Sequence, residues 1–256
     1  RPLGTATPQR PRRAPPTPLA ARGAAVVVNG RSEETAQRAA ADVREHVPGA
    51  DVLGVAADLA TDEGTAAVLD AVPHVDVLVN NLGIFSSADP LAIDDATWRR
   101  YFEVNVLAGV RLTRAYLPGM TERGWGRVQF VGSDSAVVIP AEMIHYGVTK
   151  TALLGVSRGF AKAAAGTGVT VNSVLAGPTH TGGVEAFARE LVGDDLPWDE
   201  AQRVFMREHR PQSLLQRLIE PEEIAHMVAY LASPLASATT GAAVRVDGGY
   251  IDSIVP

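Results

Sequence analysis

Tyr146 and Lys150 are the residues in this sequence whose types and spacing are best suited to chemistry. They stand four residues apart in a stretch expected to begin a helix, so both side chains would project from one helix face. A free phenol titrates near pH ~10, and an ammonium held close to it favours the phenolate. A drop of about three pKa units would need roughly 4 kcal/mol of differential stabilisation. A tyrosine tuned in this way can pass a proton to or from a carbinol oxygen.

Ser133 strengthens this interpretation, because Tyr and Lys at this spacing also occur by chance on helix surfaces. It precedes Tyr146 by thirteen residues and follows the apolar run Val128–Gly132. A hydroxyl at a strand end, then a short loop and then Tyr-x-x-x-Lys on a helix, predict a site that binds a carbonyl or alcohol oxygen.

Further motifs make the sequence resemble the short-chain dehydrogenase/reductase family from about Ala24 to Gly249. The family's Asn-Asn-Ala-Gly motif, which follows its fourth strand, stands here as Asn80-Asn81-Leu82-Gly83. The other matches are Asp58 after the third strand, Asn105 on a helix, and Val246-Asp247-Gly248-Gly249 near the C-terminus. These motifs occur in the family's order and at plausible spacings.

The resemblance implies hydride transfer between a nicotinamide and the carbon of a carbonyl or alcohol. It makes Tyr146 the general acid in reduction, and it makes Lys150 the group that lowers the tyrosine's pKa and holds the nicotinamide ribose. Ser133 would bond the carbonyl oxygen, and Asn105 would bind a water in the proton relay. Ser135 is a rival for Ser133, but its spacing to Tyr146 matches the family less well.

The 3-oxoacyl-carrier-protein reductases resemble this sequence most among the family's subgroups, although many small carbonyl and alcohol substrates share these motifs. Gly182–Arg210 corresponds to the insertion that covers the substrate in the family and sets specificity. Before it, Ala176 replaces the usual proline of the loop Ala176-Gly177-Pro178-Thr179, which predicts a looser loop over the nicotinamide.

Arg31 and Ser32 indicate the choice of cofactor, because they follow the expected second strand where NAD-specific enzymes place an acid. Arg31 would pair with a 2′-phosphate, and Ser32 would add a hydrogen bond. NADP is therefore favoured, with NAD as the alternative. Arg31 as a solvated loop residue and Ser32 as a helix cap is the competing interpretation. Asp58 would meet the adenine edge, or else cap the next helix. The expected cofactor-binding residues are Arg31, Ser32, Asp58, Leu59, Asn81, Gly83, Tyr146, Lys150 and Thr179.

Apolar runs alternate with helical stretches, which predicts an α/β fold, a Rossmann-like doubly wound parallel sheet with helices on both faces. The expected strands are Ala24–Asn29, Asp51–Ala57, Val75–Asn80, Val128–Ser133, Val169–Val174 and Ala242–Val246. The expected helices are Glu33–His46, Asp62–Val72, Asp95–Arg123, Glu142–Ala165 and Pro221–Ala232. Residues 19–256 would form a single catalytic domain.

The N-terminal segment 1–18 departs from the family. The glycines of the phosphate-binding loop should fall near positions 6, 10 and 12, where the sequence has Ala6, Arg10 and Arg12. Pro15, Pro16 and Pro18 occupy the expected first helix, and each costs about 3 kcal/mol in a helix interior. Residues 1–4 are too few and too polar for a central strand. We therefore expect residues 1–18 to be irregular, to leave a gap in the sheet, and to weaken NADP(H) binding.

Three explanations of this segment stay open. Residues 1–23 hold five arginines, six prolines and no acid, a composition typical of a disordered tail. A targeting peptide fits less well, because an apolar core is missing and prolines spoil an amphipathic helix. An out-of-frame reading of a GC-rich gene explains both the composition and the length, and the nucleotide sequence in the neighbouring frame would test it.

Composition limits the remaining classes of function. The chain has no cysteine and a net charge of −6, which disfavour thiolate metal sites and nucleic-acid partners. The histidines lack the spacing of metal ligands, and His145 either lines the substrate pocket or packs in the protein. The longest apolar runs are shorter than the ~20 residues of a membrane span. The expectation is a cytoplasmic homo-oligomer, a dimer or tetramer, paired through 95–123 and 142–165, where Val106, Val110, Leu153 and Val156 recur at helical spacing.

Two other functions compete with that of an oxidoreductase. Without its phosphate loop, the chain would be a folded remnant or an assembly subunit that keeps the catalytic residues but cannot bind cofactor. A first strand with a glycine turn would favour the enzyme, and a rearranged phosphate site would favour the remnant. A nucleotide-sensing regulator is disfavoured, because such proteins tend to lose the Tyr or the Lys.

Overall fold

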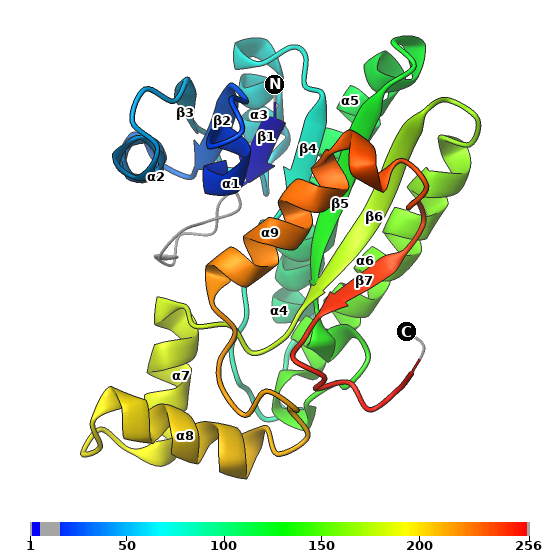
Figure 1. Ribbon diagram of the computed structural model, residues 1–256. Helices are drawn as coiled ribbons and strands as arrows, with labels where there is room; N and C mark the ends of the chain where they lie inside the picture. Colours follow the sequence, from blue (N-terminus) through cyan, green and yellow to red (C-terminus); the bar gives the residue numbers. More distant parts are fainter. Residues whose placement is uncertain (1, 6–15, 255–256) are drawn as a thin grey trace.

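The computed structural model describes residues 2–5 and 16–254, which form an α/β fold around a seven-stranded parallel sheet (Figure 1). The strands are β1 Pro2–Thr5, β2 Val26–Gly30, β3 Val52–Ala56, β4 Val77–Asn80, β5 Gly126–Ser133, β6 Val169–Ala176 and β7 Ala243–Val246. Their order in the sheet is β3-β2-β1-β4-β5-β6-β7. The chain thus winds outward in both directions from β1 and β4, which confirms the predicted doubly wound arrangement. Ligands of such sheets bind beyond the carboxyl ends of the strands, near the point where the order reverses.

Helices cover both faces of the sheet. They are α1 Pro16–Ala20, α2 Glu33–His46, α3 Asp62–Ala71, α4 Asp95–Phe102, α5 Ala108–Glu122, α6 Ile144–Ala163, α7 Gly182–Val192, α8 Trp198–His209 and α9 Pro221–Ala232. Local signals fix several of their ends. Ser32 forms a capping box with Thr35 at the start of α2, and Pro221 stands in the first turn of α9 beside a Glu220–Glu223 capping box. Both helices begin and end where the sequence predicted.

Alternating strand residues build a separate apolar core on each face of the sheet. Val27, Leu78 and Phe130 pack with residues of α3, α5 and α6 on one face. Val28 and Val79 pack with residues of α1, α2 and α9 on the other. Figure 1 shows α9 crossing the front of the sheet, with α5 and α6 behind it. Strands buried on both faces read as nearly continuous apolar runs, which is why the sequence revealed them.

The described part of the N-terminal segment differs from the prediction. Pro2–Thr5 forms β1, which pairs with β2 and β4 and leaves no gap between them. Because β1 lies within the sheet, a domain boundary at residue 18 does not separate it from the domain. Pairing on both sides satisfies the backbone of this short strand, which composition alone did not foresee. Positions 6, 10 and 12 lie outside the described residues.

Helix α1 also corrects the prediction that prolines exclude a helix here. It spans five residues and contains Pro16 and Pro18. The first turn of a helix tolerates proline, because its amide groups have no partner within the helix. Prolines therefore shorten this helix without abolishing it.

The predicted helix Asp95–Arg123 is interrupted. A π-helical segment, Glu103–Leu107, separates α4 from α5. Such bulges re-aim side chains and often occur at functional sites. The helical apolar pattern in this region and in α6 reflects packing on the sheet, since Val106 and Leu153 are buried in the core and Val110 and Val156 pack against it.

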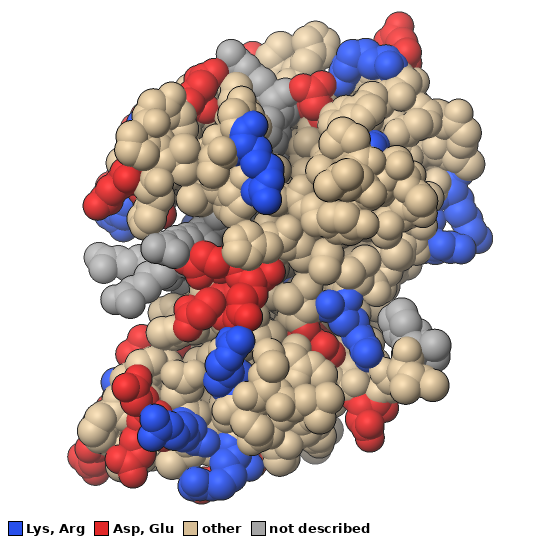
Figure 2. Space-filling model, in the orientation of Figure 1, with Lys and Arg blue, Asp and Glu red and all other residues tan. Residues whose placement is uncertain are grey.

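The insertion Gly182–Arg210 forms the helix pair α7 and α8, which lies below the sheet in Figure 1. Ala188, Phe205, Met206 and Leu218 give this pair a small apolar core of its own. Figure 2 shows acidic and basic side chains mixed over this face of the molecule. Among the described helices, none has the length and apolarity that crossing a membrane requires.

Candidate active site

Ser133 ends β5, a strand buried along its whole length, and stands at the start of the turn Asp134–Ala136. Its Oγ donates a hydrogen bond to Asp134 Oδ1 at 2.8 Å and accepts one from the Ser135 amide at 3.1 Å. Ser135 Oγ also donates to Asp134 Oδ1, at 3.3 Å. Both serines are buried and line the same cavity, so position alone does not remove Ser135 as a rival.

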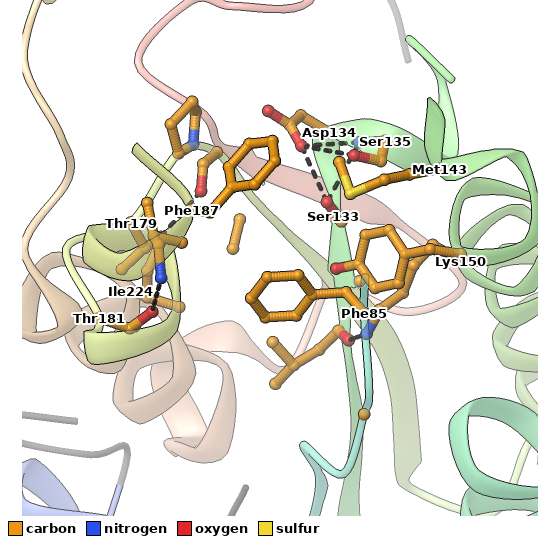
Figure 3. Close-up of a pocket in the computed structure, with 18 of the residues that line it drawn as sticks. Phe85, Ser133, Asp134, Ser135, Met143, Lys150, Thr179, Thr181, Phe187 and Ile224 are labelled. Atoms are coloured by element: carbon orange, nitrogen blue, oxygen red, sulfur yellow. Dashed lines mark hydrogen bonds between the residues drawn. The ribbon is translucent and has the colours of Figure 1, made fainter. Parts of the chain in front are cut away.

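Tyr146 and Lys150 lie on α6 and line the same cavity as Ser133. Figure 3 shows Ser133 and Lys150 in this cavity. The buried Lys150 Nζ donates to the carbonyl of Val131 at 2.9 Å and lies 5.6 Å from the centroid of the Tyr146 ring. Gly83 lies beside this lysine, since a Cβ at position 83 would be 3.5 Å from Nζ, an ordinary van der Waals distance. The structure thus brings together the three residues that the sequence had separated by seventeen positions.

The electrostatics of the pair differ from the prediction. Burial raises the pKa of Tyr146, and the Ser133 hydroxyl offsets only part of this rise. Burial also lowers the pKa of Lys150 to about 8. The expected lowering of the tyrosine's pKa by the lysine is therefore absent as the residues lie, because desolvation outweighs attraction between groups this far apart. The phenol is protonated at neutral pH, which suits a group that gives up a proton.

Asn105 lies in the π-helical segment, and its side chain ties three elements together. Its Oδ1 accepts from the Ile84 amide at 2.8 Å, and its Nδ2 donates to the Ile84 carbonyl and to Thr149 Oγ1, each at 3.0 Å. The side chain thereby fixes the loop after β4 against α6. Asn105 also lines a cavity of about 10 Å³, which is close to the space of one water.

The main cavity has a volume of about 320 Å³ and lies between the carboxyl ends of β4, β5 and β6 and the helices α7 and α8. Figure 3 shows Phe85 and Phe187 reaching into it from opposite sides. The Phe85 ring lies 6.0 Å from that of Tyr146. Met143, Val184, Phe205 and Ile224 add to its apolar wall. A small organic molecule would be largely removed from water here.

The residues predicted to bind cofactor fall into two groups. Asn81, Gly83, Tyr146, Lys150 and Thr179 line the main cavity, so the nicotinamide end of a dinucleotide fits beside the tyrosine. The remaining four stand after β2 and β3 on the same edge of the sheet, outside the lining of this cavity: Arg31, Ser32, Asp58 and Leu59.

These four residues have distinct settings. Arg31 and Ser32 are both exposed, and Ser32 caps α2 as one of the two interpretations predicted. A hydrogen bond from Ser32 to a 2′-phosphate stays a prediction. Thr61, and not Asp58, caps α3, which removes the alternative proposed for the aspartate. The Asp58 carboxylate accepts from the Ala60 amide at 3.1 Å. Leu59 is buried at the sheet edge.

The loop after β6 is held firmly although Ala176 replaces a proline. A Cβ on Gly177 would lie 2.6 Å from the Asp247 Cα, so only glycine allows this approach. The Gly177 amide donates to Val246 at 3.0 Å, and the Ile219 amide donates to Pro178 at 2.8 Å. The predicted loosening is absent from the described residues.

His145 packs in the protein and does not line the main cavity. It is fully buried, with its ring 4.1 Å from that of Tyr101, and neither ring nitrogen has a hydrogen-bond partner among the described residues. Burial lowers its pKa. Of the two interpretations, the structural one is correct.

Sequence reasoning missed Asp134 and Arg210, which both line the cavity. A signal for Asp134 was present, because an acid between two serines at the end of an apolar strand is unusual for a buried position. Arg210 gave no such signal. It ends the insertion, and only the packing of α8 brings it to the sheet edge.

A parallel doubly wound sheet with a Ser–Tyr–Lys set at its carboxyl edge defines an oxidoreductase of the Rossmann type. A profile of the family described as "Enoyl-(Acyl carrier protein) reductase" matches residues 16–251. The chain belongs to the short-chain dehydrogenase/reductase family and is an NAD(P)-dependent oxidoreductase of that family.

Three relatives illustrate the similarity. The uncharacterized oxidoreductase YvaG of Bacillus subtilis is 49% identical over 92% of this chain and 90% of its own length. The 3-oxoacyl-[acyl-carrier-protein] reductase FabG of Vibrio cholerae is 33% identical, over 90% and 88%. A crystal structure of L-sorbose reductase from Gluconobacter frateurii, complexed with NADPH and L-sorbose, superposes with a TM-score of 0.89. It is 32% identical and covers 99% of this chain and 97% of its own.

Proposed function

We propose that the chain is a ketoreductase that transfers a hydride between NADP(H) and a carbonyl or alcohol carbon, in the manner of the 3-oxoacyl-carrier-protein reductases. The observation that carries the proposal is the meeting of Ser133, Tyr146 and Lys150 at one apolar cavity. Bound at the residues that share this cavity, the nicotinamide would supply or accept the hydride.

The three side chains have complementary roles in this proposal. Ser133 holds the substrate oxygen beside Tyr146. The phenol, kept protonated by burial, gives its proton to that oxygen as negative charge develops there. Lys150, whose pKa is about 8, is mostly cationic at neutral pH and would hold the ribose hydroxyls of the nicotinamide. Asn105 fixes the loop after β4 and holds a water for reprotonation.

NADP is proposed over NAD on the basis of Arg31. It is exposed directly after β2, and no ion pair engages it within the described part of the chain. Its guanidinium is therefore available to a 2′-phosphate, with the Ser32 hydroxyl beside it. The NADPH in the similar L-sorbose reductase crystal structure supports this choice.

The alternative is a remnant of the same fold that cannot bind cofactor. The sequence favours it at Ala6, Arg10 and Arg12, where the family has glycines that let backbone amides approach a pyrophosphate. The presence of β1 supports the enzyme, because the strand that precedes this loop is in place.

Fluorescence titration with NADPH and NADH distinguishes the two functions. It should be run on this chain and on one whose residues 1–18 are replaced by a family segment with three glycines, followed by assays of NADPH oxidation with ketones. Cofactor binding and ketone reduction by either chain support a ketoreductase site. Failure of both in the restored chain would contradict it, and activity only in the restored chain would assign the native chain to the remnant.

The homo-oligomer, a dimer or tetramer paired through α4–α5 and α6, also remains a proposal. The residues that first suggested it pack inward, but Leu107 and Val148 on the same segments are 40% and 36% exposed. Sedimentation at micromolar concentration should show a dimer or larger species, and a monomer would contradict the proposal.

A further inference from the structure

Among the described residues, Asp134 uses only one of its carboxylate oxygens in hydrogen bonds. Oδ1 accepts hydrogen bonds from the Ser135 amide at 2.7 Å, from Ser133 Oγ at 2.8 Å and from Ser135 Oγ at 3.3 Å. Figure 3 shows the second oxygen turned away from both serines. The residue is 7% exposed and lines the cavity, so this oxygen is an acceptor in a nearly dry place.

Arg210 provides the opposite charge on the same wall. Its Nη1 donates to the His209 carbonyl at 2.6 Å, and its guanidinium lies 5.3 Å from the Phe205 ring centroid and 5.9 Å from that of Tyr250. Burial raises the pKa of Asp134, and the positive charge of Arg210 offsets part of this rise. The two groups therefore interact electrostatically. Within the described residues, however, neither a hydrogen bond nor an ion pair joins them. A small polar group between them would be a partner for both.

The other polar residues of the cavity are engaged locally. Thr179 Oγ1 donates to the Gly177 carbonyl at 2.8 Å, and Thr181 Oγ1 accepts from the Val184 amide at 3.3 Å. Polar recognition therefore concentrates at two neighbouring points, the Ser133–Tyr146 pair and the Asp134–Arg210 pair, and the rest of the wall is largely apolar.

We propose that the cavity recognises an α-hydroxyketone with an apolar substituent, or the matching vicinal diol, with Asp134 and Arg210 binding the second oxygen. This substrate class rests on the ketoreductase function proposed above. Ser133 Oγ lies 2.8 Å from Asp134 Oδ1, and the free oxygen belongs to the same carboxylate. Two substrate oxygens on adjacent carbons therefore suit a site in which one meets Ser133 and the other meets the free oxygen of Asp134. A hydroxyl donates to the free oxygen of Asp134 and accepts from Arg210, whereas a carboxylate at that place would meet Asp134 as a like charge.

Asp134 also stabilises the turn after β5, and a purely structural role must be separated from recognition. A disturbed turn would weaken the binding of every substrate that contacts Ser133 and Tyr146. Loss of a contact to the second oxygen would weaken the binding only of substrates that carry this oxygen. The ratio of affinities for a matched pair of ligands in one protein preparation distinguishes these cases.

The test compares 2-hydroxyacetophenone with acetophenone and with benzoylformate, which carries a carboxylate in place of the hydroxymethyl group. Binding is measured by saturation-transfer NMR on the full chain with excess NADP⁺, which cannot supply a hydride and so allows no reduction of the ketones. We expect the hydroxyketone to bind at least about tenfold tighter than acetophenone, as for a hydrogen bond to a charged group. Benzoylformate should bind no tighter than acetophenone.

The variants are Asp134→Asn, Arg210→Met, which keeps the stem against the two rings, and Asp70→Asn, a control at an exposed acid on α3. The ratio of affinities for 2-hydroxyacetophenone over acetophenone should fall below about threefold in Asp134→Asn. It should decrease in Arg210→Met and stay unchanged in Asp70→Asn. Equal binding of the two ketones, an unchanged preference in Asp134→Asn, or a preference for benzoylformate would each overturn the proposal. If Asp134→Asn does not fold, Arg210→Met decides the question, and an unchanged preference there overturns it.

Measurements of turnover distinguish a wrong substrate class from a wrong ketoreductase function. NADPH oxidation with the same ketones is measured on the chain with a restored N-terminus. Absence of oxidation with all ketones contradicts a ketoreductase, whereas oxidation of acetophenone as fast as 2-hydroxyacetophenone leaves the ketoreductase and contradicts the substrate class.

Discussion

The two halves of the proposed cofactor site match the sequence motifs of the family to different degrees. The half formed by β4, β5 and α6 carries the family's motifs at Asn80–Gly83, Ser133, Tyr146 and Lys150. The structure brings Asn81, Gly83, Ser133, Tyr146 and Lys150 to one cavity. The half that follows β1 has the strand but lacks the glycines. A strand needs only backbone pairing, which its neighbours supply, whereas a phosphate loop needs backbone conformations that few residues other than glycine adopt. We therefore expect the fold to tolerate an N-terminal sequence that a phosphate-binding loop would not.

The largest effect is expected from the N-terminal half. Replacing residues 1–18 with a family segment should tighten NADPH binding by roughly three orders of magnitude, because several charge-assisted hydrogen bonds of about 1.5–3 kcal/mol each would form. Restoring glycine at positions 6, 10 and 12 alone should not achieve this, because Pro15, Pro16 and Pro18 remain where the family's first helix begins. Fluorescence titration measures both. A micromolar or tighter dissociation constant for the unaltered chain would show that the N-terminal interpretation is wrong.

The catalytic half is tested by Tyr146→Phe, which removes one oxygen and leaves the ring beside Phe85. Turnover should fall by about 10²–10⁴-fold, with little change in NADPH affinity or stability, because the proton donor is lost and the packing is kept. Tyr230→Phe is the matched control, since Tyr230 lies exposed on α9. Steady-state kinetics would measure this effect in a chain whose residues 1–18 are replaced by the family segment. If Tyr146→Phe keeps turnover within a few-fold of that chain, Tyr146 is not the proton donor.

Arg31→Ala sharpens the comparison after β2, which lies on the other side of β1 from the catalytic half. If its guanidinium binds a 2′-phosphate, the preference for NADPH over NADH should fall by roughly tenfold, while NADH binding stays nearly constant. Arg38→Ala serves as control, because Arg38 is an exposed arginine on α2 whose partner is Glu34. Competitive titration of the two cofactors gives the ratio. An unchanged ratio would make Arg31 a solvated loop residue.

The smallest effect concerns His145, which precedes Tyr146 in the chain and has no polar partner for its ring nitrogens among the described residues. Because burial lowers its pKa in the folded state, the unfolded chain takes up the proton first as the pH falls below about 6.5. The stability that the neutral ring contributes is complete above that pH and is lost below it, at up to about 1.4 kcal/mol per pH unit. Urea unfolding at pH 7 and pH 5 should show a smaller pH dependence for His145→Leu. His74→Leu, at an exposed histidine, should match the parent chain.

Much of the site was predictable because its signals are local. Ser133 ends an apolar strand, and Tyr146 and Lys150 stand one helical turn apart, so spacing alone placed them on neighbouring elements. Arg210 was not predictable, because nothing near it in the sequence marks a buried charge. Asp134 was missed despite its place between two serines, since a charged residue beside a strand end is usually solvated. The π-helical segment around Asn105 was also missed, because the apolar pattern of Asp95–Arg123 runs through it almost unchanged.

The sequence by itself determined the layers of the fold and the bounds of α2 and α9, because burial on both sheet faces and helix capping leave local marks. It also predicted the Ser–Tyr–Lys set from spacing and family motifs. Only the tertiary structure decided that Pro2–Thr5 completes the sheet, that α7 and α8 close over its carboxyl edge, and that burial raises the pKa of Tyr146 while lowering that of Lys150. These outcomes depend on groups distant in the chain, since backbone pairing, desolvation and the meeting of Asp134 with Arg210 exist only after packing has brought those groups together.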